Sequence, residues 1–121
     1  MIAKIEKFED IESRKISKEL TNYIYILTNK VEFSKDWWLK DQIRRASVSI
    51  LSNIAEWFER NSDKEFRQFL FVAKWSCGEV RAQLYIAHDQ WYITDNEFDQ
   101  SISLCLQISK LLSKFITYLH T

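Results

Sequence analysis

Proline is absent from this 121-residue chain, and glycine occurs only once. These two residues supply the unusual φ angles and chain breaks on which tight β-hairpins and short strands depend, so their near absence argues against an all-β or mixed fold. The length fits one domain with a substantial core. We therefore predict a single all-α domain over residues 1–121, with four helices of about 20 residues joined by short connections.

Apolar residues make up 46% of the chain and charged residues 28%, which is typical of a folded globular protein. No apolar run is long enough to span a bilayer, and the N-terminal residues lack the apolar core of a signal peptide. These features predict a cytoplasmic protein. Cys77 and Cys105 lie in apolar helical patterns without CxxC spacing, so we interpret them as small buried thiols.

The spacing of apolar residues predicts a first helix over about residues 10–29 and a second over about residues 36–60. A polar connection over residues 30–35 separates them, and Asp36 is the expected N-cap of the second helix. The first helix has one apolar stripe and the second has two, which need two partners. The stripe of the first helix is Ile16, Leu20, Tyr23 and Leu27. The two stripes of the second helix are Ile43, Ile50, Ile54 and Phe58, and Val48, Leu51 and Ala55.

Two capping boxes predict the starts of the third and fourth helices, because in each a hydroxyl residue is followed three positions later by glutamate. They are Ser62-Asp63-Lys64-Glu65, which starts a helix at Asp63, and Thr94-Asp95-Asn96-Glu97, which starts one that reaches about Leu119. The third helix has the clearest heptad, formed by Phe66, Leu70, Ala73, Cys77, Val80, Leu84 and Ala87. The fourth is apolar at Phe98, Ile102, Cys105, Leu112, Phe115 and Leu119, with Leu104, Ile108 and Leu111 adjacent.

Short connections make sequential helices antiparallel neighbours, so we predict an antiparallel up-down-up-down four-helix bundle. The second, third and fourth helices carry more apolar surface than one intramolecular seam needs. In a monomer this surplus would face water, and we therefore predict a homo-oligomer with these three helices at the interface.

Patterns typical of catalytic or metal sites are missing from the sequence. A di-metal site in a bundle needs Glu-x-x-His on two helices, but Tyr85 precedes His88 by three residues and Thr117 precedes His120 by three. There is also no glycine-rich phosphate loop and no nucleophile elbow. We predict a protein that is not an enzyme and that has no metal, cofactor or small-molecule substrate.

The chain has 17 basic and 17 acidic residues, so nucleic acid could bind only through a local patch or through charges aligned by oligomerisation. Arg67, Lys74, Arg81 and His88 recur every seven residues along the third helix and form a basic stripe. Guanidinium and ammonium groups along a rigid helix can contact several phosphates at once. The candidate phosphate contacts are Arg44, Arg45, Arg60, Lys64, Arg67, Lys74 and Arg81.

A second interpretation treats the same residues as ordinary solvated helix faces with intrahelical ion pairs. Asp63 can pair with Arg67 on the third helix. On the second helix, one of the two adjacent arginines can pair with Asp41 or Glu56. The sequence leaves both interpretations open.

Residues 42–56, QIRRASVSILSNIAE, closely resemble the signature QIRRAAVSIPSNIAEG of the four helix bundle proteins encoded in intervening sequences of bacterial 23S rRNA genes. Residues 64–87 resemble the third helix of that family, and the similarity extends over about residues 8–119. The resemblance implies an antiparallel four-helix bundle that assembles as a ring, a homopentamer. Related bundle proteins are accessory factors of diversity-generating retroelements, where they bind nucleic acid and a reverse transcriptase.

The resemblance therefore implies two classes of function. One is binding of RNA or another nucleic acid through basic helix faces. The other is a scaffold that recruits a protein partner such as a polymerase or a reverse transcriptase. Salt-dependent RNA binding distinguishes the two.

Several positions depart from the family pattern. Leu51 stands where the family usually has proline, and Trp38, Trp57, Trp75 and Trp91 stand where glycine is common. A tryptophan at such a site should overpack or force a rearrangement. We hypothesise that the source gene uses UGA as a glycine codon and that these tryptophans come from translation with a code that reads UGA as tryptophan. UGG codons at the four positions would refute this hypothesis. The alternative is that the tryptophans are native and form an aromatic surface for stacking bases.

Overall fold

The computed structural model describes residues 2–60 and 67–119, with side chains described for residues 11–60 and 67–118. Within these ranges the protein has five helices and no strand. The helices are α1 (Ile2–Thr28), α2 (Val31–Lys35), α3 (Trp37–Glu59), α4 (Gln68–Asp89) and α5 (Asp95–Leu119). The predicted all-α class is confirmed.

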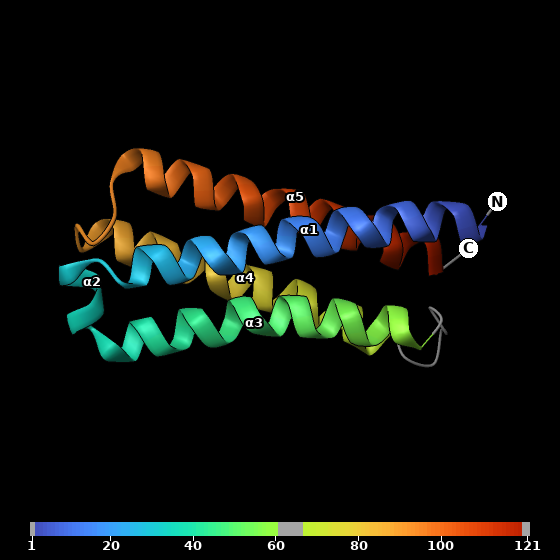
Figure 1. The fold of residues 1–121 in the computed structure, drawn as a ribbon, viewed down its shortest axis with the longest axis horizontal. Helices are drawn as coiled ribbons and strands as arrows, with labels where there is room; N and C mark the ends of the chain where they lie inside the picture. The colour runs from blue at the N-terminus through green and yellow to red at the C-terminus, as the bar shows by residue number, and fades with distance from the viewer. Residues whose placement is uncertain (1, 61–66, 120–121) are drawn as a thin grey trace.

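The four long helices lie side by side as a helical bundle (Figure 1). α1 packs against α3 and α5, and α4 packs against the same two helices. No contact of comparable extent joins α1 to α4 in the described residues, so these two helices are diagonal to each other. Both chain termini lie at one end of the bundle, whereas α2 and the connection between α4 and α5 lie at the other (Figure 1).

The core is organised around the heptad predicted for α4. Its described members are all buried, whereas Phe66 lies outside the described residues. Buried aliphatic residues of the other helices also belong to the core, and most of them lie in the predicted stripes. On α1, however, Ile24 is fully buried, whereas the predicted Tyr23 is half-buried. The core includes Leu70, Ala73, Val80, Leu84 and Ala87 from α4, Ile16, Leu20, Ile24 and Leu27 from α1, Ile43, Ile50 and Ile54 from α3, and Ile108, Leu112 and Phe115 from α5.

Cys77 on α4 and Cys105 on α5 are free, buried thiols, which confirms their interpretation from the sequence. Burial raises the pKa of each thiol to about 12, because the thiolate would lose its hydration inside the bundle. Both groups therefore stay protonated near neutral pH and act as small apolar side chains.

Small hydroxyl residues lie where the helices meet. Thr21 Oγ1 donates to the carbonyl oxygen of Ser17 on its own helix (2.8 Å) and to that of Ser47 on α3 (3.3 Å). The hydroxyl oxygens of Ser49 on α3 and Ser76 on α4 are 2.9 Å apart. Small side chains at these contacts allow the helix backbones to approach closely. These contacts also fix the relative heights of α1, α3 and α4 along the bundle.

Two predicted helix starts are confirmed. The backbone N–H of Leu39 donates to Asp36 Oδ1 (3.1 Å), so Asp36 caps α3. At the start of α5, the Glu97 N–H donates to Thr94 Oγ1 (3.1 Å) and the Thr94 N–H donates to Glu97 Oε1 (2.9 Å), which is the reciprocal pattern of a capping box. The third predicted box, residues 62–65, and the predicted helix start at Asp63 lie outside the described residues.

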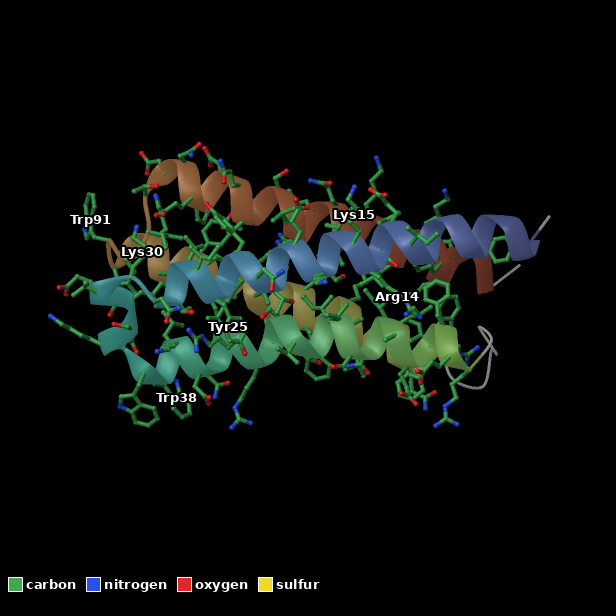
Figure 2. All side chains as sticks on the ribbon, viewed as in Figure 1. Arg14, Lys15, Tyr25, Lys30, Trp38 and Trp91 are labelled. Carbon is green, nitrogen blue, oxygen red and sulfur yellow. The ribbon has the colours of Figure 1, made fainter. Side chains whose placement is uncertain are left out.

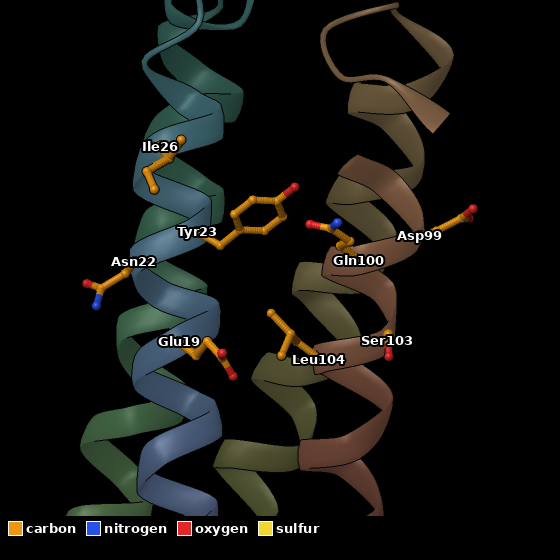
Figure 3. Close-up of a pocket in the computed structure, with 8 residues that line it drawn as sticks. All are labelled: Glu19, Asn22, Tyr23, Ile26, Asp99, Gln100, Ser103 and Leu104. Atoms are coloured by element: carbon orange, nitrogen blue, oxygen red, sulfur yellow. The ribbon is translucent and has the colours of Figure 1, made fainter. Parts of the chain in front are cut away.

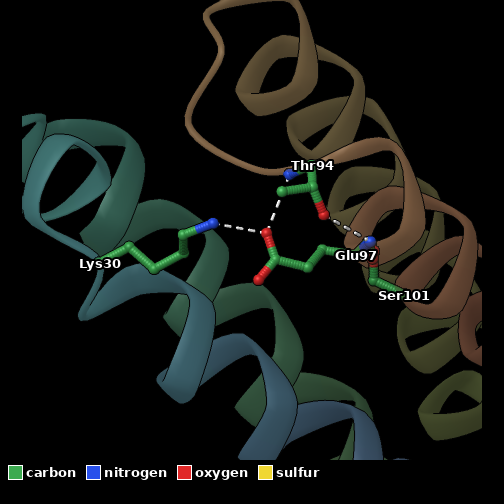
Figure 4. Close-up of polar contacts among 4 residues, drawn as sticks. All are labelled: Lys30, Thr94, Glu97 and Ser101. Atoms are coloured by element: carbon green, nitrogen blue, oxygen red, sulfur yellow. Dashed lines mark hydrogen bonds and ion pairs between the residues drawn. The ribbon is translucent and has the colours of Figure 1, made fainter.

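The Glu97 carboxylate also accepts a hydrogen bond from Lys30 Nζ, as Figure 4 shows, and so ties the end of α1 to the start of α5. Burial alone would raise the pKa of Glu97, but the hydrogen bonds from Lys30 and Thr94 outweigh it and hold the pKa below its ordinary value. The carboxylate thus stays ionised and keeps its cap near neutral pH.

The predicted polar connection over residues 30–35 was wrong, because most of it forms the short helix α2. Phe33 is fully buried, and its ring lies 5.2 Å from that of Tyr92, which closes this end of the bundle. The Tyr92 hydroxyl donates to Asp36 Oδ2 (3.0 Å). One apolar anchor among polar neighbours was therefore enough to order the connection.

The first predicted helix was too short at its N-terminus, since α1 begins at Ile2 rather than near residue 10. Residues 2–9 contain no proline or glycine, so nothing in their sequence stops a helix. The predicted ends of the second helix agree with α3 to within one residue.

The four tryptophans at glycine-like positions differ in environment. Trp38, Trp75 and Trp91 are 63%, 74% and 89% exposed, so none of these three overpacks the bundle. Figure 2 shows Trp38 and Trp91 projecting at the end occupied by α2. Trp57 is instead 2% exposed, and its indole nitrogen has no hydrogen-bond partner.

Trp91 has a left-handed backbone, with φ of 66°. It directly follows the end of α4, where its N–H donates to the His88 carbonyl (3.0 Å) and the Tyr92 N–H donates to the Ala87 carbonyl (2.9 Å). These bonds form a Schellman motif, whose left-handed position is usually glycine. The local geometry at this position is thus the kind that glycine adopts without strain.

We expect Trp91→Gly to stabilise the protein by about 0.5–1 kcal/mol, because relief of the left-handed strain exceeds the added entropy of unfolded glycine. Urea denaturation would measure this change. Ser52→Gly is a control at an exposed position in the middle of α3, where glycine should lower stability by about 0.5 kcal/mol. Destabilisation by both substitutions would show that Trp91 is not strained.

None of the helices in the described part of the chain combines the length and apolar character needed to cross a bilayer.

Candidate functional site

The predicted phosphate contacts lie on two helices that face different neighbours. Arg44, Arg45 and Arg60 belong to α3 and its C-terminal end, whereas Arg67, Lys74 and Arg81 belong to α4 and its N-terminal end. Lys64 lies outside the described residues. The two groups need to be considered separately.

Arg44 is engaged within the bundle. Its Nε donates to Thr28 Oγ1 (2.8 Å) and its terminal nitrogen donates to Asn29 Oδ1 (3.1 Å). The guanidinium also lies 4.3 Å from the centre of the Tyr25 ring, where the cation meets the face of the π system. Arg44 therefore links α3 to the C-terminal end of α1 through hydrogen bonds and a cation–π contact. The sequence did not reveal this structural role.

Arg45 and Arg60 form ion pairs with acidic residues one turn earlier on α3. Arg45 Nε lies 2.8 Å from Asp41 Oδ2, and an Arg60 terminal nitrogen lies 3.2 Å from Glu56 Oε1. The arginine side chains are 75% and 48% exposed, and exposed pairs of this type contribute little to stability. Both guanidinium groups can therefore exchange their carboxylate for a phosphate at small cost.

The basic stripe on α4 extends along the side of this helix that faces α5. Arg67 and Lys74 are exposed and Arg81 is half-buried. The positive charge of Arg81 lowers the pKa values of Cys77 and Cys105, although burial dominates both, and this places Arg81 near the seam between the helices. Arg81 is thus less open to a phosphate than Arg67 and Lys74.

His88 continues the stripe but is occupied. Its Nε2 lies 2.7 Å from Asp95 Oδ1, and its ring lies 4.6 Å from the ring of Phe98 on α5. The ring of Tyr85 also contacts Phe98, with centroids 5.0 Å apart. This end of the stripe therefore joins α4 to α5.

Sequence reasoning missed a groove between α1 and α5. It contains two hollows, of about 630 Å³ and 780 Å³, one after the other along the helices. Figure 3 shows the first hollow, where Tyr23 of α1 points toward Gln100 of α5 and Leu104 of α5 points toward α1. We name this surface the α1/α5 groove; its apolar lining residues are Ile16, Tyr23, Ile26, Leu104, Leu111 and Tyr118. Only the spacing of Leu104 and Leu111 beside the core stripe of α5 hinted at it.

A second apolar surface covers the exposed side of α4. The heptad uses the buried side of this helix, yet several large apolar side chains point away from it. We name them the α4 outer face: Phe71, Val72, Trp75, Tyr85 and Ile86, which are 45%, 40%, 74%, 51% and 49% exposed. The apolar surplus predicted for the third helix is therefore observed on α4.

Among the described residues, no group of three or more His, Cys, Asp or Glu side chains lies close enough to bind a metal ion.

Comparison with known proteins places this bundle in a family. The chain superposes with a TM-score of 0.79 on the crystal structure of a protein of unknown function from the S23 ribosomal protein family of Bacteroides thetaiotaomicron, at 24% identity, covering 93% of this chain and 99% of that one. No curated protein matches significantly. Residues 9–114 match the family described as 23S rRNA-intervening sequence protein. The chain therefore belongs to the 23S rRNA-intervening sequence protein family.

Proposed function

We propose that this chain is a non-enzymatic, cytoplasmic bacterial protein that works as a homo-oligomer of antiparallel up-down-up-down four-helix bundles. The observation that carries this proposal is the α4 outer face. α4 is apolar on its buried side and again on its outer side, whereas a surface helix normally has one apolar side with a polar side opposite it. α4 has its heptad buried and Phe71, Trp75 and Ile86 exposed on the other side.

Full burial of a Phe, Ile or Val side chain contributes about 1.5–3 kcal/mol. Covering several half-exposed residues of the α4 outer face therefore contributes several times the free energy of a surface ion pair to association. A group of large exposed apolar side chains on a small protein often marks an interface. Self-association requires no other partner, and the resemblance to ring-forming bundle proteins agrees with it.

RNA binding is the second candidate, and the exposure of Arg67 and Lys74 on one line of α4 favours it. Arg45 and Arg60 add two exposed guanidinium groups with weak ion pairs. In a ring, each of these charges is repeated in every copy, so a neutral chain can still present a row of cations to phosphates. The family description, which refers to 23S rRNA, supports RNA as the nucleic acid to test first.

Salt dependence tests RNA contact directly. If the α4 stripe contacts phosphates, replacing Arg67, Lys74 and Arg81 together with Gln should reduce the slope of log K against log salt by about 2 for single-stranded RNA. Fluorescence anisotropy with a labelled 23S rRNA fragment would measure it. A charge-matched control replaces the exposed Lys15, Lys18 and Lys110 with Gln and should leave more of the slope intact.

An equal loss of slope in the control would mean that only net charge matters, and an unchanged slope in the stripe variant would discard the stripe. Absence of RNA binding at low salt, with assembly intact, would leave the protein-recruiting scaffold as the function.

A further inference from the structure

A small hollow of about 410 Å³ opens at the end of the bundle where α2 and the connection between α4 and α5 lie. Three aromatic rings, two carboxylates and one ammonium group line it. They belong to Trp37, Trp38, Tyr92, Glu32, Asp36 and Lys35. We name this site the aromatic corner. None of its residues belongs to the basic stripe or to the α1/α5 groove.

The two tryptophans form adjacent walls of the aromatic corner. Their ring centroids are 6.2 Å apart, and the angle between the ring planes is 82°. Trp37 is 71% exposed and Trp38 is 63% exposed, so most of each side chain is open to a ligand; Figure 2 shows Trp38 projecting at this end. Tyr92 supplies the third ring, and its contact with the buried ring of Phe33 fixes its position. The three rings therefore come together only in the folded bundle.

The carboxylates give the aromatic corner a negative charge. Asp36 is held in place, because its Oδ1 accepts from the Leu39 N–H (3.1 Å) and its Oδ2 accepts from the Tyr92 hydroxyl (3.0 Å). Glu32 Oε1 lies 3.3 Å from Lys35 Nζ, but these side chains are 69% and 68% exposed, so the pair is weak. The hydrogen bond to Asp36, together with burial and the charges of Asp36 and Glu32, raises the pKa of Tyr92. The Tyr92 ring therefore lies in a negative potential.

Rings and carboxylates in this arrangement select a cation. The face of an aromatic ring is negative and attracts cations, whereas the two carboxylates repel phosphate and other anions. The N-terminus of α3 would favour an anion, but the Asp36 carboxylate already caps it. Both Asp36 oxygens accept hydrogen bonds within the protein, so the site suits a cation that has no N–H group to satisfy.

We propose that the aromatic corner binds a quaternary ammonium group, with Trp37, Trp38 and Tyr92 against its methyl groups and Glu32 and Asp36 as counter-charges. Aromatic rings are the usual receptors for such groups. Free choline and a trimethylated lysine side chain both carry this group. The proposal depends neither on self-association nor on RNA binding, and it takes Trp38 as a native residue.

Saturation-transfer NMR on the methyl signal of choline tests the proposal, because this method detects weak binding to a protein of any size. Choline should bind the parent chain saturably. Its uncharged isostere, 3,3-dimethyl-1-butanol, should bind at least about fivefold more weakly, because it lacks the cation. A short peptide with one trimethylated lysine separates the two sources of the group: tighter binding than choline assigns the site to a protein ligand, and weaker binding assigns it to a free molecule.

The corner variant carries Trp37→Leu and Glu32→Gln, which remove one ring face and one charge; Asp36 is retained because it caps α3. This variant should bind choline about 5–10-fold more weakly than the parent. The matched control carries Trp75→Leu and Glu79→Gln, the same two changes at exposed positions on α4, and should bind choline like the parent. Circular dichroism should show equal helix content in both variants.

Trp38→Gly removes the second wall and should weaken choline binding by about 2–5-fold, the effect of one exposed cation–π contact. An unchanged affinity in this variant would overturn the inference.

Three further results would overturn it: no saturable binding of choline by the parent chain, equal affinities for choline and its uncharged isostere, or equal losses in the corner variant and the control. Adenosine that binds the parent and loses affinity in the corner variant, without any binding of choline, would instead make the corner a surface for stacking bases.

Discussion

Replacing Leu84 with alanine is expected to lower the free energy of unfolding by about 2–5 kcal/mol, the range observed when buried leucines are truncated. Leu84 is fully buried in the α4 heptad, and α4 packs against α3 and α5. The loss has two parts, which are the transfer energy of the removed methyl groups and the cavity that a rigid bundle cannot close. Urea denaturation at a fixed protein concentration would measure it.

Val48→Ala is the control for this measurement, because Val48 is 41% exposed on α3 and its truncation leaves no closed cavity. It should cost less than about 1 kcal/mol. Equal losses for the two variants would mean that the α4 seam is not the centre of the core.

Trp57→Ala is expected to have a similarly large effect, a loss of about 3–5 kcal/mol. The indole is 2% exposed and packs against the rings of Phe58 and Phe115, with centroids 4.6 Å and 5.4 Å away. Removal of the ring leaves a cavity beside Phe58 and Phe115. Thermal and urea unfolding would both detect this loss.

Trp57→Phe separates packing from hydrogen bonding. The indole N–H is buried without a partner, so phenylalanine removes an unsatisfied donor while retaining much of the aromatic contact. We expect this variant to lose much less stability than Trp57→Ala. If Trp57→Gly were as stable as the parent chain, the large predicted loss would be wrong, and the hypothesis of glycine codons would gain support at this position.

The parts of the fold that followed from sequence depend on periodic or local signals. The α4 heptad and the stripes of α1, α3 and α5 predicted most of the buried residues, because helix geometry alone brings residues three and four apart to one side. The caps at Asp36 and Thr94 were predictable because each involves atoms only three residues apart. Such interactions do not depend on how the helices are arranged.

The parts that the sequence did not reveal depend on contacts between distant residues. The helix α2 forms because Phe33 packs on Tyr92, a residue of the opposite connection. Arg44 was interpreted as a phosphate contact, and the end of α1 supplies the Thr28, Asn29 and Tyr25 groups that hold it. The α1/α5 groove likewise exists only once two helices from opposite ends of the chain pack together.

The mass of the folded chain in solution is the most direct test of the claim that its surplus apolar surface drives self-association. Light scattering coupled to size-exclusion chromatography, repeated over a wide range of concentration, should give a fixed multiple of the 14.6 kDa chain mass. A mass of 14.6 kDa at every concentration would contradict the account, because the α4 outer face would then be stable in contact with water.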